Sequence, residues 1–179
     1  MKITQTHIED CIIIEPNVFG DDRGFFLETF HEKRYLEEAN IKEKFVQDNR
    51  SRSTKGVLRG LHFQKTKPQG KLVSVTRGAV FDVAVDLRLN SKTFGEFHSI
   101  ILSEENKLQF YIPPGFAHGF VVLTDLADFQ YKCTDYYDPA DESGIIWNDS
   151  RINITWPIQN PILSIKDKKL KTLEEILSE

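Results

Sequence analysis

The amino-acid sequence predicts an all-β protein, a sandwich or a barrel of short strands with little helix. Short apolar runs, each long enough for one strand, recur at near-regular spacing and are separated by turn residues. Only two segments carry apolar residues at helical spacing. No linker or low-complexity stretch interrupts the 179 residues. We therefore expect one domain that spans residues 1–179.

The expected strands begin with a short apolar run that Pro16 ends. In chain order they are Cys11–Ile14, Gly24–Phe30, Phe45–Arg50, Leu72–Thr76, Ala79–Leu87, Phe97–Leu102, Gln109–Ile112, Gly119–Leu123, Ala127–Cys133 and Gly144–Trp147, with a further strand expected inside Val57–Lys71. Asn17–Gly24 is rich in Gly, Asp and Asn and is predicted to be a loop. The two expected helices are Glu32–Ala39 and Leu170–Leu177.

Charge, cysteine content and hydropathy exclude several classes of protein. The formal net charge of -4 argues against a general nucleic-acid binder, because a phosphate backbone favours a basic face. Cys11 and Cys133, far apart in a chain whose start lacks an apolar signal region, are expected to be reduced thiols. The longest apolar runs are too short to span a bilayer. A cytoplasmic protein with no membrane partner is expected.

The stretch Val57–Lys71 (VLRGLHFQKTKPQGK) is the first candidate for chemistry. Arg59 can hold an anion, His62 can act as a base near neutral pH, and Lys71 supplies a fixed cation. The alternative to a catalytic role is that His62 is an ordinary strand residue whose ring donates a hydrogen bond to a neighbouring carbonyl. Arg59 and His62 are three residues apart and would point to opposite faces of a regular strand. We therefore predict a bulge or twist at Gly60.

A second candidate is Ile112–Phe120 (IPPGFAHGF), in which a tight turn precedes His118. Its PxGxxH spacing resembles the second motif of the cupin superfamily, whose members are small jelly-roll barrels and often bind a metal there. The first cupin motif would supply HxH and a carboxylate, but this chain has His62-Phe63-Gln64 and Lys71. Since an ammonium group is no metal ligand and repels a cation, a metal-free pocket is expected.

The remaining candidates lie in the second half of the chain. Tyr131 can serve as a general acid, although its strand face could equally belong to the core. Tyr137 and Glu142 follow it closely. Asp167 could orient His62 as the carboxylate of a hydrolase triad does, or form an ordinary solvated pair with Lys166.

Several longer motifs occur in order along nearly the whole chain. They are FxDxRGxFxE (Phe19 to Glu28), QxN (Gln47 to Asn49), VLRGLHFQ, the Gly70-Lys71 pair, PPGFAHGF, YKCTDYYDP, GIIWND, ITWP and LSIKD. Together they resemble the dTDP-4-dehydrorhamnose 3,5-epimerase (dTDP-sugar epimerase) family of cupin folds. The resemblance implies a cupin-type jelly-roll β-barrel with short peripheral helices.

The resemblance also implies a mechanism and a set of site residues. His62 would remove the protons at C3 and C5, Asp167 would be its carboxylate partner, Tyr131 would return a proton to the opposite face, and Lys71 would stabilise the enolate oxygen at C4. Residues implied to bind the substrate are Phe19, Arg23, Glu28, Gln47, Asp48, Asn49, Arg59, His118, Tyr137, Glu142 and Lys166. A homodimer is implied, in which the N-terminal residues reach the partner's ligand. No cofactor and no metal are implied.

The implied reaction inverts C3 and C5 of dTDP-4-dehydro-6-deoxy-D-glucose to give dTDP-4-dehydro-L-rhamnose. The product would serve dTDP-L-rhamnose and cell-surface polysaccharide synthesis, including lipopolysaccharide O-antigen. Two alternatives stay open. One is a 3- or 5-monoepimerase for a related dTDP-4-keto sugar, and the other, less favoured, is a non-catalytic or metal-dependent cupin.

Overall fold

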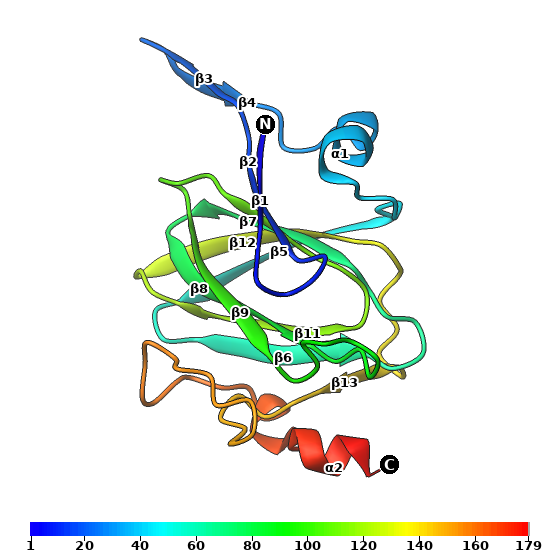
Figure 1. Ribbon diagram of the computed structural model, residues 1–179. Coiled ribbons are helices and arrows are strands. Elements are labelled where there is room, and N and C mark those ends of the chain that lie inside the picture. The colour runs from blue at the N-terminus through cyan, green and yellow to red at the C-terminus, as the bar shows by residue number, and fades with distance from the viewer. Residues whose placement is uncertain (179) are drawn as a thin grey trace.

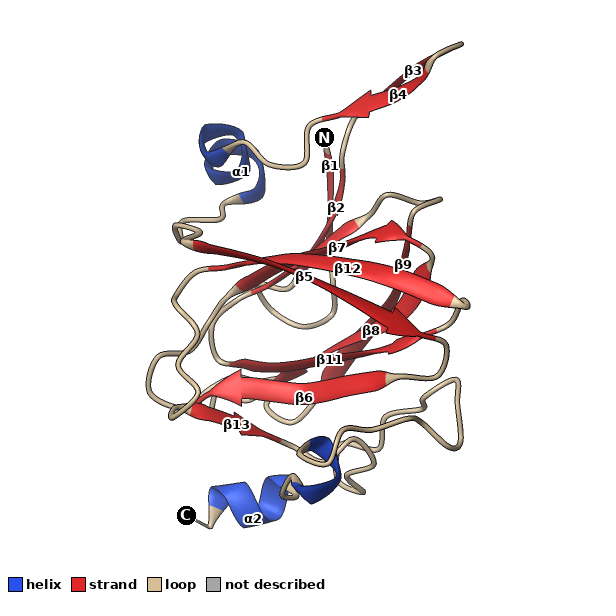
Figure 2. Ribbon diagram, turned by 180° about the vertical axis from the view of Figure 1, so that it is seen from behind, coloured by secondary structure: helices blue, strands red, loops and turns tan. Residues whose placement is uncertain are grey.

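Two antiparallel sheets face each other and enclose the interior of the protein (Figures 1 and 2). The structure, a computed structural model, describes residues 1–178, so the final residue of the predicted domain lies outside it. One sheet has the strand order β1-β2-β10-β7-β12-β5 and the other β13-β6-β11-β8-β9. This arrangement confirms the predicted all-β fold class.

The six-stranded sheet supplies one wall of the interior and the five-stranded sheet the other. The first comprises β1 (Lys2–Gln5), β2 (Ile12–Glu15), β10 (Gln109–Ile112), β7 (Lys71–Arg77), β12 (Leu126–Cys133) and β5 (Gln47–Thr54). The second comprises β13 (Glu142–Gly144), β6 (Leu58–Gln64), β11 (Phe116–Val122), β8 (Ala79–Asp86) and β9 (Phe97–Ser103).

A separate hairpin of β3 (Val18–Asp21) and β4 (Gly24–Leu27) projects from the body of the protein (Figures 1 and 2). The prediction of a loop over Asn17–Gly24 is wrong here, since β3 occupies half of it and β4 begins at Gly24. All four residues of β3 are exposed, so the strand carries no alternation of buried and polar residues that a sequence reading could detect. The strand β1 was also not predicted, and only one of its residues is even partly buried.

The first helix, α1 (Glu32–Ala39), has the predicted bounds. The His31 side chain accepts a hydrogen bond from the Arg34 backbone N–H at its start, and Asn40 ends it in the left-handed conformation. The second helix is shorter than predicted. A 3-10 turn, η1 (Asp167–Lys169), and an extended Leu170 precede α2 (Leu173–Leu177), which starts at a capping box.

Apolar side chains pack in three layers that explain why strands such as β8 are buried on both faces. The largest cluster fills the space between the sheets and includes Phe110 and Phe129. A second lies between the five-stranded sheet and the C-terminal segment, where Trp156 and Leu173 cover it. A third holds α1 against the six-stranded sheet through Tyr35. Over the described part of the chain, no helix is long and apolar enough to cross a membrane.

Candidate active site

The strand β6 is irregular at Gly60, as the spacing of Arg59 and His62 predicts. His62 pairs with His118 of β11, whereas Arg59 pairs with Phe120, so three steps on β6 face two steps on β11. Gly60 has a φ of +111° and precedes a cis peptide bond, and a Cβ atom at this position would lie 2.6 Å from the His118 carbonyl oxygen. The extra residue turns the strand so that Arg59 and His62 both face the same cavity.

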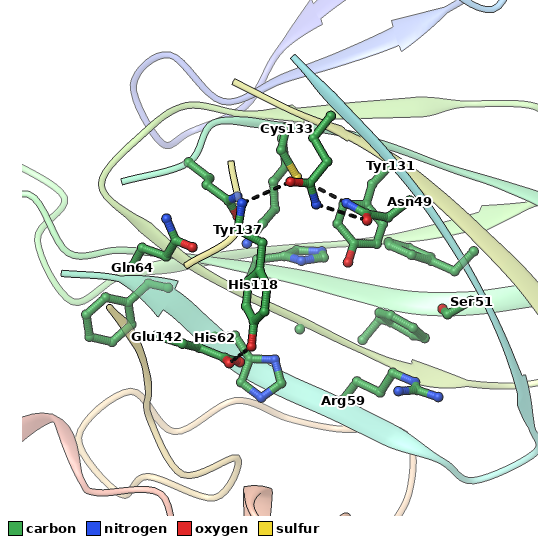
Figure 3. A pocket seen from close by; sticks show the side chains of 17 residues that line it. Asn49, Ser51, Arg59, His62, Gln64, His118, Tyr131, Cys133, Tyr137 and Glu142 are labelled. Atoms are coloured by element: carbon green, nitrogen blue, oxygen red, sulfur yellow. Dashed lines mark hydrogen bonds between the residues drawn. The ribbon is translucent and has the colours of Figure 1, made fainter. Parts of the chain in front are cut away.

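This cavity, of about 330 Å³, lies between β6 and β11 of one sheet and β5, β7 and β12 of the other (Figure 3). Its lining is rich in polar and aromatic side chains. The lining residues are Gln47, Asn49, Ser51, Arg59, His62, Phe63, Gln64, Gln69, Lys71, His118, Gly119, Phe120, Phe129, Tyr131, Cys133, Tyr137 and Glu142. Nine of the predicted site residues are among them.

The predicted pairing of His62 with Asp167 is present in the structure. The Nε2 atom of His62 lies 2.6 Å from Oδ1 of Asp167, across 105 residues of sequence. Burial alone would raise the pKa of Asp167, but the hydrogen bond and charge of His62 outweigh it, with help from Ser164, and lower the pKa below its usual value. A carboxylate that stays ionised fixes Nε2 as the protonated nitrogen and leaves Nδ1 free to accept a proton.

Tyr131 lies on the opposite wall of the cavity from His62 (Figure 3), since β12 belongs to the six-stranded sheet and β6 to the five-stranded sheet. Burial raises the pKa of the Tyr131 phenol, and the Arg59 charge opposes that rise only in part. The phenol therefore holds its proton at neutral pH. A group that can accept a proton and one that can donate a proton face each other across the cavity.

Lys71 opens β7 on the same wall as Tyr131, next to Cys133 in the sheet register. Its side chain is buried, and this burial lowers the pKa of the ammonium group, while the charges of Asp82 and Glu142 oppose the shift. A buried cation is costly unless an anion compensates it. Lys71 thus provides a site for a negative charge that develops inside the cavity.

The buried carboxylate of Asp82 holds His118 in place. Nε2 of His118 lies 2.9 Å from Oδ2 of Asp82, whose side chain is inaccessible to solvent. The imidazole also stacks on Phe129, with ring centroids 5.8 Å apart. Within residues 1–178, Oδ1 of Asp82 is the one buried side-chain polar atom without a hydrogen-bond partner.

Three further predicted residues line the half of the cavity formed by β5 and β6. Gln47 donates to Asn49 at 3.0 Å, and Arg59 donates through Nε to Ser53 at 3.0 Å. Asp48 is not among the residues that line this cavity, and its contact with the substrate stays a prediction. Its side chain points to the other face of β5 and accepts from Lys132 at 2.9 Å, because successive residues of a strand alternate in direction.

Glu142 joins two segments that enclose the cavity. Its Oε2 accepts hydrogen bonds from the Tyr137 hydroxyl and from the Lys166 ammonium group. Burial would raise the pKa of Glu142, but these two donors outweigh it and lower the pKa. The Glu142 bond raises the pKa of Tyr137 to about 12. Because Lys166 directly precedes Asp167, Glu142 also ties the segment that carries Asp167 to β13.

The three predicted hairpin residues lie apart from this cavity. Phe19, Arg23 and Glu28 do not line it, and Phe19 is 62% exposed. Arg23 pairs with Asp21, and Glu28 accepts from Arg34 at 2.6 Å.

Several supporting residues escaped the sequence prediction. Asp82 holds His118, Ser53 holds Arg59, and Ser164 accepts a hydrogen bond from the Asp167 backbone N–H at 3.0 Å. The alternation along the strands could have revealed Asp82, which occupies a buried face of β8. No sequence signal marks the two serines, since their roles depend on residues brought close by the fold.

The chemistry available in the cavity is proton transfer beside a stabilised negative charge. Over the described residues, no group of three or more His, Cys, Asp and Glu side chains is placed to hold a metal ion. The donor set includes Lys71, which fits an anion and not a metal. His62 and Tyr131 lie on opposite walls of the cavity, and the Lys71 cation lines it as well. This arrangement suits removal and return of a proton next to a carbonyl group.

Comparison with known proteins identifies relatives that share both sequence and fold. The sequence profile of the family described as dTDP-4-dehydrorhamnose 3,5-epimerase matches residues 5–175. The enzyme of that name from Escherichia coli (strain K12) is 55% identical over 99% of this chain and 97% of its own. A dTDP-4-dehydrorhamnose 3-epimerase from Streptomyces niveus is 38% identical over 98% of this chain and 85% of its own.

A solved structure extends the comparison to three dimensions. The dTDP-6-deoxy-D-glucose-3,5-epimerase from Legionella pneumophila Philadelphia 1, in complex with dTDP-4-keto-L-rhamnose, is 57% identical. The match has a TM-score of 0.95 and covers 98% of this chain and 94% of that one. Sequence and fold agree, and the chain belongs to the dTDP-4-dehydrorhamnose 3,5-epimerase family.

Proposed function

We propose that the chain inverts C3 and C5 of dTDP-4-dehydro-6-deoxy-D-glucose and so produces dTDP-4-dehydro-L-rhamnose. Family membership supports the reaction type, and the relative from Legionella was solved with dTDP-4-keto-L-rhamnose. The observation that carries the assignment of roles is the His62–Asp167 pair, which lies across the cavity from Tyr131. Inversion requires these two groups to act on opposite faces of the sugar ring.

The reaction begins with a C–H bond next to the C4 ketone. Nδ1 of His62 takes the proton from C3 or C5, and the electron pair of that bond moves to the C4 oxygen as an enolate. The Lys71 ammonium group stabilises the enolate charge, which is usually the largest contribution to such catalysis. Tyr131 then protonates the same carbon from the opposite face. His62 gives up its proton to solvent and Tyr131 regains one, so no oxidant or reductant is consumed.

The cavity divides into parts for the sugar and for the nucleotide. His118 and Glu142 lie with His62 at the sugar, and Arg59 contacts the diphosphate. Gln47, Asn49, Tyr137 and Lys166 complete the proposed binding surface. Neither cofactor nor metal has a role in this mechanism.

The proposed enzyme is a homodimer. In this arrangement the β3–β4 hairpin of each subunit carries Phe19, Arg23 and Glu28 to the nucleotide of its partner. The exposed phenylalanines of the hairpin, Phe19, Phe25 and Phe26, support this proposal because they form an apolar surface on a projecting element. The enzyme acts in the cytoplasm on the route to dTDP-L-rhamnose and to cell-surface polysaccharides such as O-antigen.

Replacement of His62 tests the assignment. In D₂O, the wild-type protein is expected to exchange deuterium into C3 and C5 of the substrate, whereas His62→Ala abolishes the exchange and retains dTDP binding. Tyr131→Phe, the matched variant on the other wall, keeps part of the exchange but fails to deliver the inverted product, chiefly at C5. Exchange by His62→Ala at the wild-type rate would remove His62 as the base.

Single epimerisation is the second candidate, because a relative with that activity is 38% identical to this chain. The higher identity to double epimerases favours inversion at both carbons. NMR of the product formed from the 4-keto-6-deoxy sugar separates the two. Coupling to a ketoreductase and NADPH gives a further test, since only the doubly inverted product leads to dTDP-L-rhamnose.

A further inference from the structure

Two histidines meet at the side of the protein where the loop after β1 lies against β9 (Figure 1). His7 belongs to the loop between β1 and β2, at the edge of the six-stranded sheet. His98 lies on β9, the edge strand of the five-stranded sheet. Neither lines the cavity described above. The pair therefore connects the edges of the two sheets through residues that the proposed reaction does not use.

The geometry of the pair matches the spacing of two metal ligands. The Nδ1 atoms of His7 and His98 are 3.3 Å apart, and the ring planes are inclined by 53°. Two nitrogens bound tetrahedrally to one ion, each at about 2.0–2.1 Å, are separated by about 3.3–3.4 Å. An N–H···N hydrogen bond also fits this distance. It would require a proton between the two nitrogens, which a metal ion would replace.

The loop that carries His7 is held firmly. The Thr6 hydroxyl donates to the carbonyls of Ile8 and Cys11, both at 2.9 Å, and Ile8 is fully buried in the core between the sheets. His98 is fixed by the ladder of β9 with β8 and packs its ring against Phe110 at 5.6 Å. The two nitrogens thus have a fixed separation before any ion binds, which reduces the entropic cost of binding.

The pair can be approached from outside the protein, although the His98 ring is partly buried. A neutral imidazole is the form that binds metal. His7 is exposed, so the space beside the two Nδ1 atoms can be reached from solvent.

We propose that His7 and His98 form a two-residue site for a divalent transition-metal ion such as Zn²⁺, Ni²⁺ or Cu²⁺, with water in the remaining positions. Imidazole nitrogens favour these ions over Mg²⁺ and Ca²⁺, which prefer oxygen ligands. The bound ion links residue 7 to residue 98 and joins the edges of the two sheets. Because this link forms only in the folded chain, metal binding stabilises the protein.

Metal titration of the full-length protein tests the site. Zn²⁺ is titrated into the wild type by calorimetry, and melting temperatures are recorded with and without the ion. One ion is expected to bind at this pair and to raise the melting temperature. His98→Ala and His7→Ala are each expected to weaken that binding by about ten-fold or more and to remove the rise, while epimerase activity is retained.

A control variant and a control ion test whether the effect of zinc is specific to the His7–His98 pair. His31→Ala removes a histidine at the start of α1 that has no histidine partner, and it should keep the zinc-dependent rise. Mg²⁺ should produce no rise in the wild type. The proposal is overturned if wild type and both pair variants show the same zinc affinity and the same zinc-dependent rise, or if the wild type binds no zinc outside the His62 cavity. The zinc-dependent change, unlike the metal-free melting temperature, does not move when a substitution only weakens packing.

Discussion

At the scale of single residues, burial in the cavity shifts the pKa values of Lys71 and Tyr131 in opposite directions. Burial lowers the pKa of Lys71 and raises the pKa of Tyr131, although both side chains lie on the same sheet. Burial always favours the neutral form, which is the free amine of lysine but the protonated phenol of tyrosine. As the pH rises, these opposite shifts favour loss of the Lys71 proton before that of Tyr131.

This order predicts which group limits activity in alkali. Lys71 carries its charge below its lowered pKa, so kcat should fall as the pH rises through a midpoint below the usual 10.5 of lysine. Lys71→Met should lose activity by about a hundred-fold or more. Its remaining activity should lack this alkaline decline. A pH–rate profile of both proteins checks the assignment, and an unchanged midpoint in Lys71→Met would contradict it.

We infer that Ser164 positions the proposed catalytic pair of His62 and Asp167. It accepts from the Asp167 backbone N–H at 3.0 Å, and its side chain helps to lower the pKa of that carboxyl. In Ser164→Ala, the pKa of Asp167 rises and the segment that carries it loosens. We expect kcat to fall by about ten-fold, with unchanged dTDP affinity, and the acidic limb of the pH–rate profile to move to higher pH.

Ser164→Thr, which keeps the hydroxyl, is the matched variant for that experiment. It should restore the acidic limb to the wild-type position. If Ser164→Ala lowered kcat without moving the limb, Ser164 would support only the local fold and not the charge of Asp167.

At the scale of the element, the bulge of β6 aligns the site. Gly60 and Gly119 lie in adjacent strands whose backbones are so close that a Cβ atom on either would come within 2.6 Å of the other strand. The close approach accommodates the extra residue on β6 that brings Arg59 and His62 into one cavity. The positions of Arg59 and His62 thus depend on the absence of a side chain at Gly60 and at Gly119.

Gly60→Ala should therefore damage both stability and activity. The new methyl group would meet backbone atoms, and φ at this position is +111°. We expect a loss of about 2 kcal/mol or more in the free energy of unfolding, measured with urea. Gly95→Ala is the control, because Gly95 also has positive φ but its nearest neighbour is 3.9 Å away. Equal losses in the two variants would show that backbone strain, and not the close approach, dominates.

The elements also show what could be predicted from the sequence. Strands with a buried face, such as β10 and β12, and the capped helix α1 carry local patterns and were placed within a residue of their bounds. The bulge was predicted because the spacing of Arg59 and His62 conflicted with a regular strand. The exposed strands β1 and β3 were missed, since their residues show no burial pattern. The partnership of Asp82 with His118 depends on strand order, which periodicity does not specify.

At the scale of the whole molecule, the projecting hairpin is the least self-sufficient part of the chain. β3 and β4 pair only with each other, and an isolated two-stranded hairpin is marginally stable in water. Its exposed Phe19, Phe25 and Phe26 leave an apolar surface uncovered in the single chain. A symmetric dimer would cover this surface twice with the same contacts. The hairpin would then bring Arg23 to the partner's cavity.

This arrangement makes a prediction that a mixture of two inactive proteins can test. Arg23→Ala should disable the cavity of the partner, whereas His62→Ala disables the cavity of its own subunit. After the two variants exchange subunits, half of the dimers are mixed. Each mixed dimer holds one cavity with both an intact His62 and an intact Arg23 from the other chain. Activity should therefore recover to about a quarter of the wild-type value.

The recovery discriminates between the two possible positions of the hairpin. If Arg23 acted on the cavity of its own chain, every cavity in the mixture would lack either His62 or Arg23, and no activity would return. A mixture of His62→Ala with Asp167→Ala, two changes on the same side of the site, is the matched control. Since one of its mixed dimer's cavities lacks His62 and the other lacks Asp167, it should stay inactive even when subunits exchange fully. Recovery in the first mixture alone would thus place each hairpin at the partner's site.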